Sequence, residues 1–365
     1  MNVSLYVHIP FCQQKCDYCD FFSVPICSEI NQSVFIQYIS AVVKEAEYYV
    51  KKYKIKKWNT IYIGGGTPSL LGGDNISFLI NKLLDLVNKN IPEEISVEVN
   101  PESVTEELID SFNQCSVTRI SMGIQALDDK VLKLINRKCT VEKIYSSLNL
   151  LKRKWNKNLS IDFIAGLPEH SYKSFENQFS ILKDYYTSHV SLYTLTVEEN
   201  TPLYKKICDN QILWNPDKAD RMWEKGRHIL ESMDYKQYEI SNFALEGFES
   251  IHNQTYWKLQ DYIGIGSGAT GTVYGDNTIR WTNTLNLKKY IEFWSDSCNK
   301  TDLSENNVEK IRHVEKIDKE TQLFEFLMMG FRMLKGISSD EFYRRFNKRI
   351  ESIIGSQDGL YSKWS

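Results

Sequence analysis

The sequence predicts an α/β fold built on a parallel, barrel-like sheet, followed by a smaller part of mixed α+β character. Between residues 3 and 196, short runs rich in β-branched residues alternate with longer stretches of helical periodicity. Six strand-then-helix repeats imply parallel strands joined by right-handed crossovers. In such sheets ligands bind at the carboxyl ends of the strands, and the unusual motifs of this chain all follow expected strand ends.

Periodicity and capping residues set the expected elements in order. In one helix, Leu79, Leu83 and Leu86 share a face. Thr105 and Ser171 suit helix N-caps. The expected strands are Val3–Ile9, Thr60–Ile63, Ile95–Val99, Thr118–Ile124, Leu159–Ile164 and Val190–Leu195. The expected helices are Ser33–Lys51, Asp74–Asn88, Thr105–Phe112, Asp128–Ile135, Val141–Trp155, Ser171–Tyr185 and Trp214–Met233, with more helix from Glu320.

Composition narrows the class of protein. The chain has 365 residues, 42% of them hydrophobic, which is enough for a large α/β unit and a smaller appended part. Its net charge of −3 is spread along the chain, which does not favour nucleic-acid binding. No apolar run reaches the ~20 residues of a membrane span, and the first residues enter a strand without a leader pattern. We therefore expect a cytoplasmic protein.

Three cysteines, Cys12, Cys16 and Cys19, share one loop after the first expected strand. A [4Fe–4S] cluster normally takes four cysteine thiolates, so three leave one iron open to another ligand. A structural zinc site is the alternative; it needs a fourth ligand, for which His8 is the nearest candidate. Cys27 is a weaker candidate for a fourth cluster ligand. We interpret all five remaining cysteines as small buried hydrophobic residues: Cys27, Cys115, Cys139, Cys208 and Cys298.

Polar and glycine-rich motifs follow the other expected strands. Gly64-Gly65-Gly66-Thr67 allows a ligand to approach the backbone closely, and its N–H groups suit a carboxylate. Glu98 and Asp162 interrupt apolar strands, so each needs a partner or a polar ligand. Gln125 and Arg137 are weaker signals, since polar residues in such loops are more often solvated. Carboxylates suit an amine or ribose, and Arg137 suits a carboxylate.

His252 lies in a segment, Ser250–Trp257, that also carries Asn253, Tyr256 and Trp257. Taken alone, this histidine is more often a hydrogen-bonded residue without a ligand. With two flat aromatic neighbours it also suits haem bound through an axial imidazole. Both interpretations stay open.

The stretch from Tyr6 to Phe21 resembles the radical S-adenosylmethionine (SAM) superfamily, in the group around oxygen-independent coproporphyrinogen III oxidase. Matching motifs are Gly64–Ser69, Glu98–Pro101, Ser121–Gln125, Asn136-Arg137 and Asp162–Pro168. The resemblance implies a partial (β/α)6 TIM-like barrel over residues 1–200 and a C-terminal domain over 201–365 that stops short of its usual end. It also implies SAM contacts at Tyr6, Gly65, Gly66, Thr67, Glu98, Gln125, Arg137 and Asp162.

Two subgroups differ at positions that can be compared. The oxidases carry a further cysteine where this chain has Phe21, and a longer N-terminal arm. His252–Trp257 is similar to the H-N-x-x-Y-W signature of the HemW haem chaperones, and Phe331–Ile337 resembles their C-terminal domain. The resemblance implies a protein that holds a [4Fe–4S] cluster, SAM and haem as cargo, with His252 as the candidate haem ligand.

The resemblance implies two functions, and a barrel that serves only for interaction is a third hypothesis. The first is haem delivery to haemoproteins such as respiratory enzymes, at the membrane or elsewhere. The alternative is decarboxylation of the propionate side chains of coproporphyrinogen III by a 5′-deoxyadenosyl radical. The sequence leaves open whether SAM is cleaved, which protein receives haem, and whether haem drives dimerisation.

Overall fold

A computed structural model describes residues 1–26, 32–296 and 305–354. Its main feature is one open sheet of twelve strands in the order β14-β13-β12-β11-β1-β4-β5-β6-β7-β8-β10-β9. The run from β11 to β8 is parallel throughout, and both flanks are antiparallel. The predicted α/β class with a parallel sheet is confirmed, and the open sheet is compatible with a partial barrel.

All six predicted parallel strands are present, with ends shifted by up to three residues. They are β1 (Asn2–Ile9), β4 (Lys57–Gly65), β5 (Glu94–Val99), β6 (Arg119–Gln125), β7 (Asn158–Ala165) and β8 (His189–Thr194). Two short strands, β2 (Phe11–Cys12) and β3 (Val24–Pro25), pair with each other beside the end of β1.

The predicted crossover helices are also present. They are α1 (Gln32–Tyr53), α2 (Gly73–Asp85), α3 (Glu106–Gln114), α4 (Asp129–Leu134), α5 (Val141–Lys154), α6 (Tyr172–Asn177) and α7 (Ile181–Asp184), followed by the predicted helix α9 (Pro216–Ser232). The short helix α8 (Pro202–Cys208) was not predicted. Thr105 and Ser171 accept N-cap hydrogen bonds, as predicted. The single helix expected over Ser171–Tyr185 is divided into α6 and α7 by a 3₁₀ turn at Gln178–Ser180.

The segment after residue 200 lengthens the sheet at both edges. β9 (Lys236–Gln237) and β10 (Asn242–Ala244) extend it beyond β8. β11 (Tyr262–Ile265), β12 (Thr270–Val273), β13 (Thr278–Asn283) and β14 (Arg312–Ile317) extend it beyond β1. One large core includes residues from both halves, such as Leu5 and Trp281, so the predicted domain boundary at residue 200 stays a prediction.

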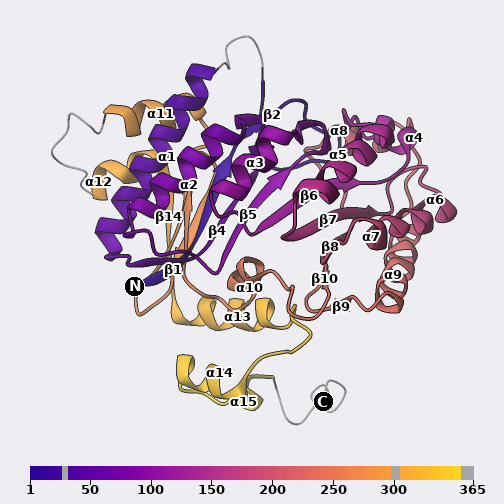
Figure 1. The fold of residues 1–365 in the computed structure, drawn as a ribbon. Helices are drawn as coiled ribbons and strands as arrows, with labels where there is room; N and C mark the ends of the chain where they lie inside the picture. The colour runs from indigo at the N-terminus through magenta and orange to yellow at the C-terminus, as the bar shows by residue number, and fades with distance from the viewer. Residues whose placement is uncertain (27–31, 297–304, 355–365) are drawn as a thin grey trace.

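The remaining helices lie outside the parallel run. They are α10 (Ile251–Trp257), α11 (Leu287–Asp296), α12 (Glu305–Val308), α13 (Lys319–Gly330), α14 (Ser339–Phe346) and α15 (Glu351–Ile354). A small second core, Leu259, Phe326, Phe342 and Ile350, joins α13 and α14 to the turn after α10. Figure 1 shows β2 at the upper edge of the sheet and α10 and α13 at its lower edge. β2, which leads into the cysteine loop, and the helices α10 and α13 therefore lie at opposite ends of the parallel strands (Figure 1).

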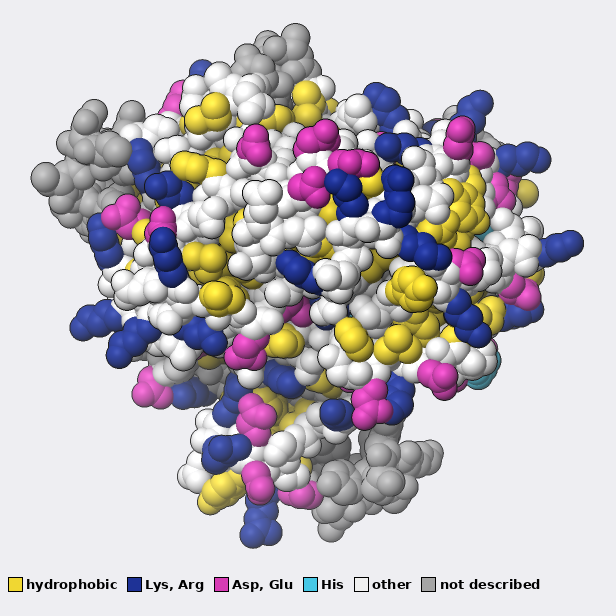
Figure 2. Space-filling view, viewed as in Figure 1, with side chains coloured by type: hydrophobic (Ala, Val, Ile, Leu, Met, Phe, Trp, Pro, Cys, Tyr) yellow, Lys and Arg dark blue, Asp and Glu magenta, His cyan; other side chains and the backbone are white. Residues whose placement is uncertain are grey.

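Charged side chains of both signs are interspersed over the face shown in Figure 2. No described helix is both long enough and apolar enough to cross a membrane.

Candidate functional site

A cavity of about 460 Å³ opens at the carboxyl ends of the parallel strands. Its size falls within the range of small-molecule sites. The cysteine loop, the glycine turn after β4 and the ends of β5 to β8 all contribute to its wall. Ten predicted site residues line it: Cys12, Cys16, Cys19, Gly65, Gly66, Thr67, Glu98, Gln125, Arg137 and Asp162. Two predicted residues, Tyr6 and His252, are not among the lining residues.

The cysteine loop is fixed at several points along its length. Thr67 N–H donates to Phe11 C=O at 2.7 Å, which places the glycine turn against the start of the loop. Asp17 N–H donates to Ile135 C=O at 3.0 Å, which holds the middle of the loop against the segment after α4. Tyr18 packs against the core beside it. The three cysteines therefore line the cavity on a loop that the neighbouring segments hold in place.

His8, the candidate fourth ligand of a zinc site, is hydrogen-bonded within the fold through both ring nitrogens. Within the described residues, no three His, Cys, Asp or Glu side chains are grouped to hold one ion. His8, the candidate zinc ligand, has Nδ1 hydrogen-bonded to Tyr6 Oη and Nε2 to Phe22 C=O, both at 2.9 Å. Cluster thiolates bind different iron atoms, so three cysteines around one cavity wall meet that need.

The remaining cysteines differ from one another. Cys115 and Cys139 are buried, as predicted. Cys208 is exposed, because it lies at the end of α8 on the solvent side, so its predicted burial is wrong. Cys27 and Cys298 lie outside the described residues.

The glycine turn, Gly64–Thr67, packs closely against the start of the cysteine loop. A Cβ at Gly66 would lie 2.5 Å from Phe11 C=O, and Gly65 has φ +115°, which favours glycine. The N–H groups of Gly65, Gly66 and Thr67 donate to Glu98 Oε2, Ile9 C=O and Phe11 C=O. The expectation that these N–H groups receive a ligand carboxylate is therefore not met, because the protein itself satisfies them. The glycines serve to bring strand and loop together.

Glu98 and Asp162 are two half-buried carboxyls on neighbouring parts of the cavity wall. Glu98 accepts from Tyr62 Oη at 2.8 Å and from Gly65 N–H at 3.0 Å, and Ser121 Oγ donates to Asp162. Burial raises the pKa of Glu98 to about 7, and the charge of Asp162 adds to this rise. Burial raises the pKa of Asp162 to about 6. A cationic ligand between them would lower both pKa values, since it stabilises the charged forms.

Arg137 reaches the cysteine loop as well as the strand ends. It donates to Gly123 C=O, to Asn100 Oδ1 at 3.1 Å and to Cys16 Sγ at 3.7 Å. Burial raises the pKa of the Cys16 thiol, and the Arg137 charge opposes this rise. Arg137 therefore supports the thiolate form that a metal ligand requires.

Gln125 ends β6 with φ +71°, an uncommon value for a residue other than glycine. A register shift between Gly123 and Gln125 turns the strand at this point. A Cβ at Gly123 would lie 2.8 Å from Gln125 Nε2, so the glycine makes room for that amide. Such bulges commonly redirect a side chain beside a site.

His252 lies at the opposite end of the strands, on α10. Its Nδ1 is 2.7 Å from Thr60 Oγ1 near the start of β4, and its Nε2 is 2.8 Å from Tyr256 Oη. Its side chain is fully buried, and burial lowers its pKa to about 3. Both ring nitrogens are thus engaged within the fold, away from the cavity that holds the other predicted residues.

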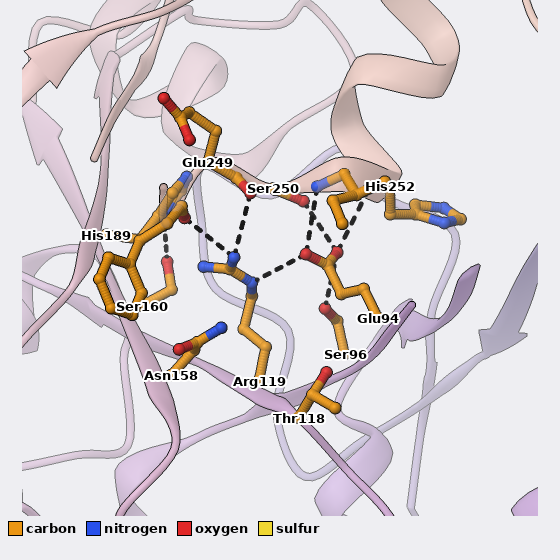
Figure 3. Close-up of polar contacts among 12 residues, drawn as sticks. Glu94, Ser96, Thr118, Arg119, Asn158, Ser160, His189, Glu249, Ser250 and His252 are labelled. Atoms are coloured by element: carbon orange, nitrogen blue, oxygen red, sulfur yellow. Dashed lines mark hydrogen bonds and ion pairs between the residues drawn. The ribbon is translucent and has the colours of Figure 1, made fainter. Parts of the chain in front are cut away.

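A buried ion pair fixes the segment that carries His252. Arg119 Nε lies 3.2 Å from Glu94 Oε2, with side chains only 3% and 4% exposed. Figure 3 shows the Glu94 carboxylate facing the first turn of α10, where it accepts hydrogen bonds from Ser250 Oγ and from the N–H groups of residues 251 and 252. Arg119 also donates to the carbonyls of Phe248 and Glu249. The network closes the amino-terminal end of the strands.

Sequence reasoning missed several residues that shape this site. Asn100 connects Arg137 to Thr67, and Tyr62 supports Glu98. For Asn100 the available signal was a period of two, because it follows Glu98 at that spacing directly after β5. Polar residues alternate with buried apolar ones along β5 and β7. The residues of that polar face are Glu94, Ser96, Glu98, Ser160 and Asp162.

Comparisons with known proteins agree with this geometry. Residues 6–180 match the radical SAM superfamily, and residues 317–356 match the HemN C-terminal domain. The chain is 33% identical to the "Heme chaperone HemW" of Lactococcus lactis over 97% of its own length and 88% of that protein. It is 32% identical to the protein of the same name from Escherichia coli K12, over 93% and 85%.

Among solved structures, coproporphyrinogen III oxidase (HemN) from Escherichia coli, a radical SAM enzyme, is similar with a TM-score of 0.77. The identity is 21%, over 96% of this chain and 80% of that one. This likeness supports the fold.

Proposed function

Because the chain belongs to the HemW family of radical SAM proteins, we propose that it binds a [4Fe–4S] cluster, SAM and haem, and delivers haem to haemoproteins in the cytoplasm or at the membrane. The proposal draws its cargo from the relatives named heme chaperones, which are similar over most of the chain. The observation that carries it is the single cavity that collects three cysteines and seven of the eight predicted SAM contacts.

Cys12, Cys16 and Cys19 would hold the cluster, whose open iron would bind SAM and can supply an electron to it. Glu98 and Asp162 would face the positive charges of SAM, since carboxylates that are half removed from water gain from a nearby cation. Arg137 already donates to Cys16 Sγ, so it would stand between the cluster and the SAM carboxylate. Gly65, Gly66, Thr67 and Gln125 would shape the wall around the ligand.

Tyr6 is not among the residues that line the cavity, so it would act on SAM indirectly. Its hydroxyl is 2.9 Å from His8 Nδ1, and its ring stacks on Tyr62, which in turn supports Glu98. We therefore assign Tyr6 to the wall that supports the SAM contacts.

For haem we propose His252 as ligand, on its match to the H-N-x-x-Y-W signature. Haem could reach its Nε2 only if the hydrogen bond to Tyr256 Oη were released, together with part of the packing of α10. Haem binding and a rearrangement of α10 should therefore occur together. A domain boundary at residue 200 and formation of a dimer in the presence of haem are further parts of the same proposal.

The test is haem titration of anaerobically reconstituted protein, followed by transfer to an apo-haemoprotein. We expect a saturable change in the haem absorbance and loss of haem to the acceptor. Incubation with coproporphyrinogen III, SAM and a reductant runs in parallel. Decarboxylated product would favour the oxidase alternative, and failure to bind haem would refute the chaperone proposal.

A further inference from the structure

The loop between the second and third cysteines is fastened to a helix that follows the parallel strands. Leu203 N–H donates to Asp17 C=O at 2.9 Å, and Lys206 Nζ lies 2.6 Å from Asp17 Oδ2. On its other side, Asp17 N–H donates to Ile135 C=O at 3.0 Å. Asp17 is thus held from two sides, one residue after Cys16 and two before Cys19.

The helix that makes these contacts, α8, is itself well anchored. Thr201 Oγ1 accepts from Tyr204 N–H at 3.3 Å and donates to Glu198 C=O at 2.6 Å. Pro202 fills the first helical position, and Leu203 is fully buried. The cap and the buried Leu203 fix the start of α8, from which the Leu203 N–H reaches Asp17.

The ion pair matters because the Asp17 carboxylate is buried. Its side chain is 6% exposed, while that of Lys206 is 39% exposed. A carboxylate buried to this degree needs a charged or hydrogen-bonding partner, and within the described chain Lys206 provides its ion pair. Without Lys206, the Asp17 carboxylate would have no ion-pair partner among the described residues. We expect it to turn toward solvent and to displace the cysteine loop.

We propose that Lys206 is a positioning residue for the cysteine loop: by pairing with Asp17, it holds Cys16 and Cys19 where the cluster binds. This inference rests on the proposed cluster. Residues that orient metal ligands typically change metal affinity by about 10–100-fold when they are removed. The Lys206 contact comes from outside residues 6–180, so the segment after the sixth parallel strand takes part in the cluster site.

The experiment compares Lys206→Met with wild type in the full chain after anaerobic reconstitution with iron and sulfide. Iron per chain and the rate at which a chelator bleaches the visible absorbance are measured. We expect bleaching to be about tenfold faster in Lys206→Met, at the lower end of the range for such residues. Lys205→Met is the matched control, because Lys205 is the exposed neighbour on the same helix and makes no ion pair with a described residue.

Two further variants separate positioning from general damage. Lys206→Arg restores a cation and should return the rate close to that of wild type. Asp17→Asn with Lys206→Met removes both charges and should bleach more slowly than Lys206→Met alone, because no buried charge is left unpaired. Melting of the apo-proteins by circular dichroism shows whether the fold is retained.

The outcomes separate the two proposals. If wild-type protein takes up no cluster, the proposed function fails and this inference fails with it. If wild type takes up the cluster and Lys206→Met bleaches at the wild-type rate, the inference alone is overturned. Equal acceleration in Lys205→Met, or no recovery in Lys206→Arg, would also overturn it.

Discussion

The two half-buried carboxyls of the cavity, Glu98 and Asp162, predict that SAM affinity depends on pH. The pKa of Glu98 is raised to about 7 and that of Asp162 to about 6, mainly by burial. SAM carries a sulfonium and an ammonium group, so it should bind the ionised carboxylates. Below these pKa values a proton must leave first, and binding becomes weaker. Affinity should therefore fall as the pH falls.

The size of the effect follows from the two pKa values. At pH 6 a single group of pKa 7 is about nine-tenths protonated, which weakens binding about tenfold. Asp162 adds about a factor of two at the same pH, which brings the total to about 20-fold relative to pH 8, or roughly 1.8 kcal/mol.

In the absence of SAM, the stability of the fold depends on pH in the opposite direction. Because the pKa of Glu98 is raised in the folded protein, its contribution to stability is present below pH ~4.5 and is lost as the pH rises through about 7.

The assay is SAM binding to reconstituted protein by equilibrium dialysis at pH 6, 7 and 8, with cluster absorbance recorded at each pH. Glu98→Gln removes the group with the higher pKa, so it should bind SAM more weakly at pH 8 and lose most of the pH dependence. Glu107→Gln, on the exposed side of α3, is the matched control. A wild-type affinity that is constant from pH 6 to 8 with the cluster intact would refute the reasoning.

Three other perturbations have defined outcomes. Arg119→Met leaves the buried Glu94 carboxylate unpaired and should lower the free energy of urea unfolding by about 3–5 kcal/mol; recovery in a Glu94→Gln, Arg119→Met double variant is the check. Gly66→Ala places a Cβ 2.5 Å from a backbone oxygen and should reduce iron uptake on reconstitution, and full uptake would count against a packing role. His252→Ala should abolish haem binding if the ring is the ligand; it should also cost about 1–3 kcal/mol of stability by leaving Thr60 without its partner, and a variant of unchanged stability would contradict the buried hydrogen bonds.

Local pattern was sufficient for the parallel part of the fold. Strand and helix periods differ, and a capping residue such as Ser171 acts on its own turn, so short windows contain the needed information. Pairing between distant segments is not contained in such windows. The extension of the sheet by β11 beside β1, for example, depends on main-chain contacts such as Tyr262 opposite Ser4.

The candidate site, like the fold, could be predicted from the sequence only in part. Topology places every parallel strand end on one side, so Cys12 and Asp162 line the same cavity although they are 150 positions apart in the chain. The role of the turn after β4 could not be obtained from the sequence, because it depends on the approach of the Phe11 carbonyl to Gly66. The position of His252 also depended on packing, since Thr60 and Glu94 are remote from it in the chain.

The amino-acid sequence by itself determined the α/β class, the three-cysteine loop and the end of the sheet at which the predicted site residues gather, because each follows from residue spacing and strand direction. Only the tertiary structure decided that the glycine-turn N–H groups are satisfied within the protein, that His252 lies at the other end of the strands, and that Lys206 reaches Asp17. These facts depend on which atoms come within hydrogen-bond distance after folding, and no local pattern encodes that distance.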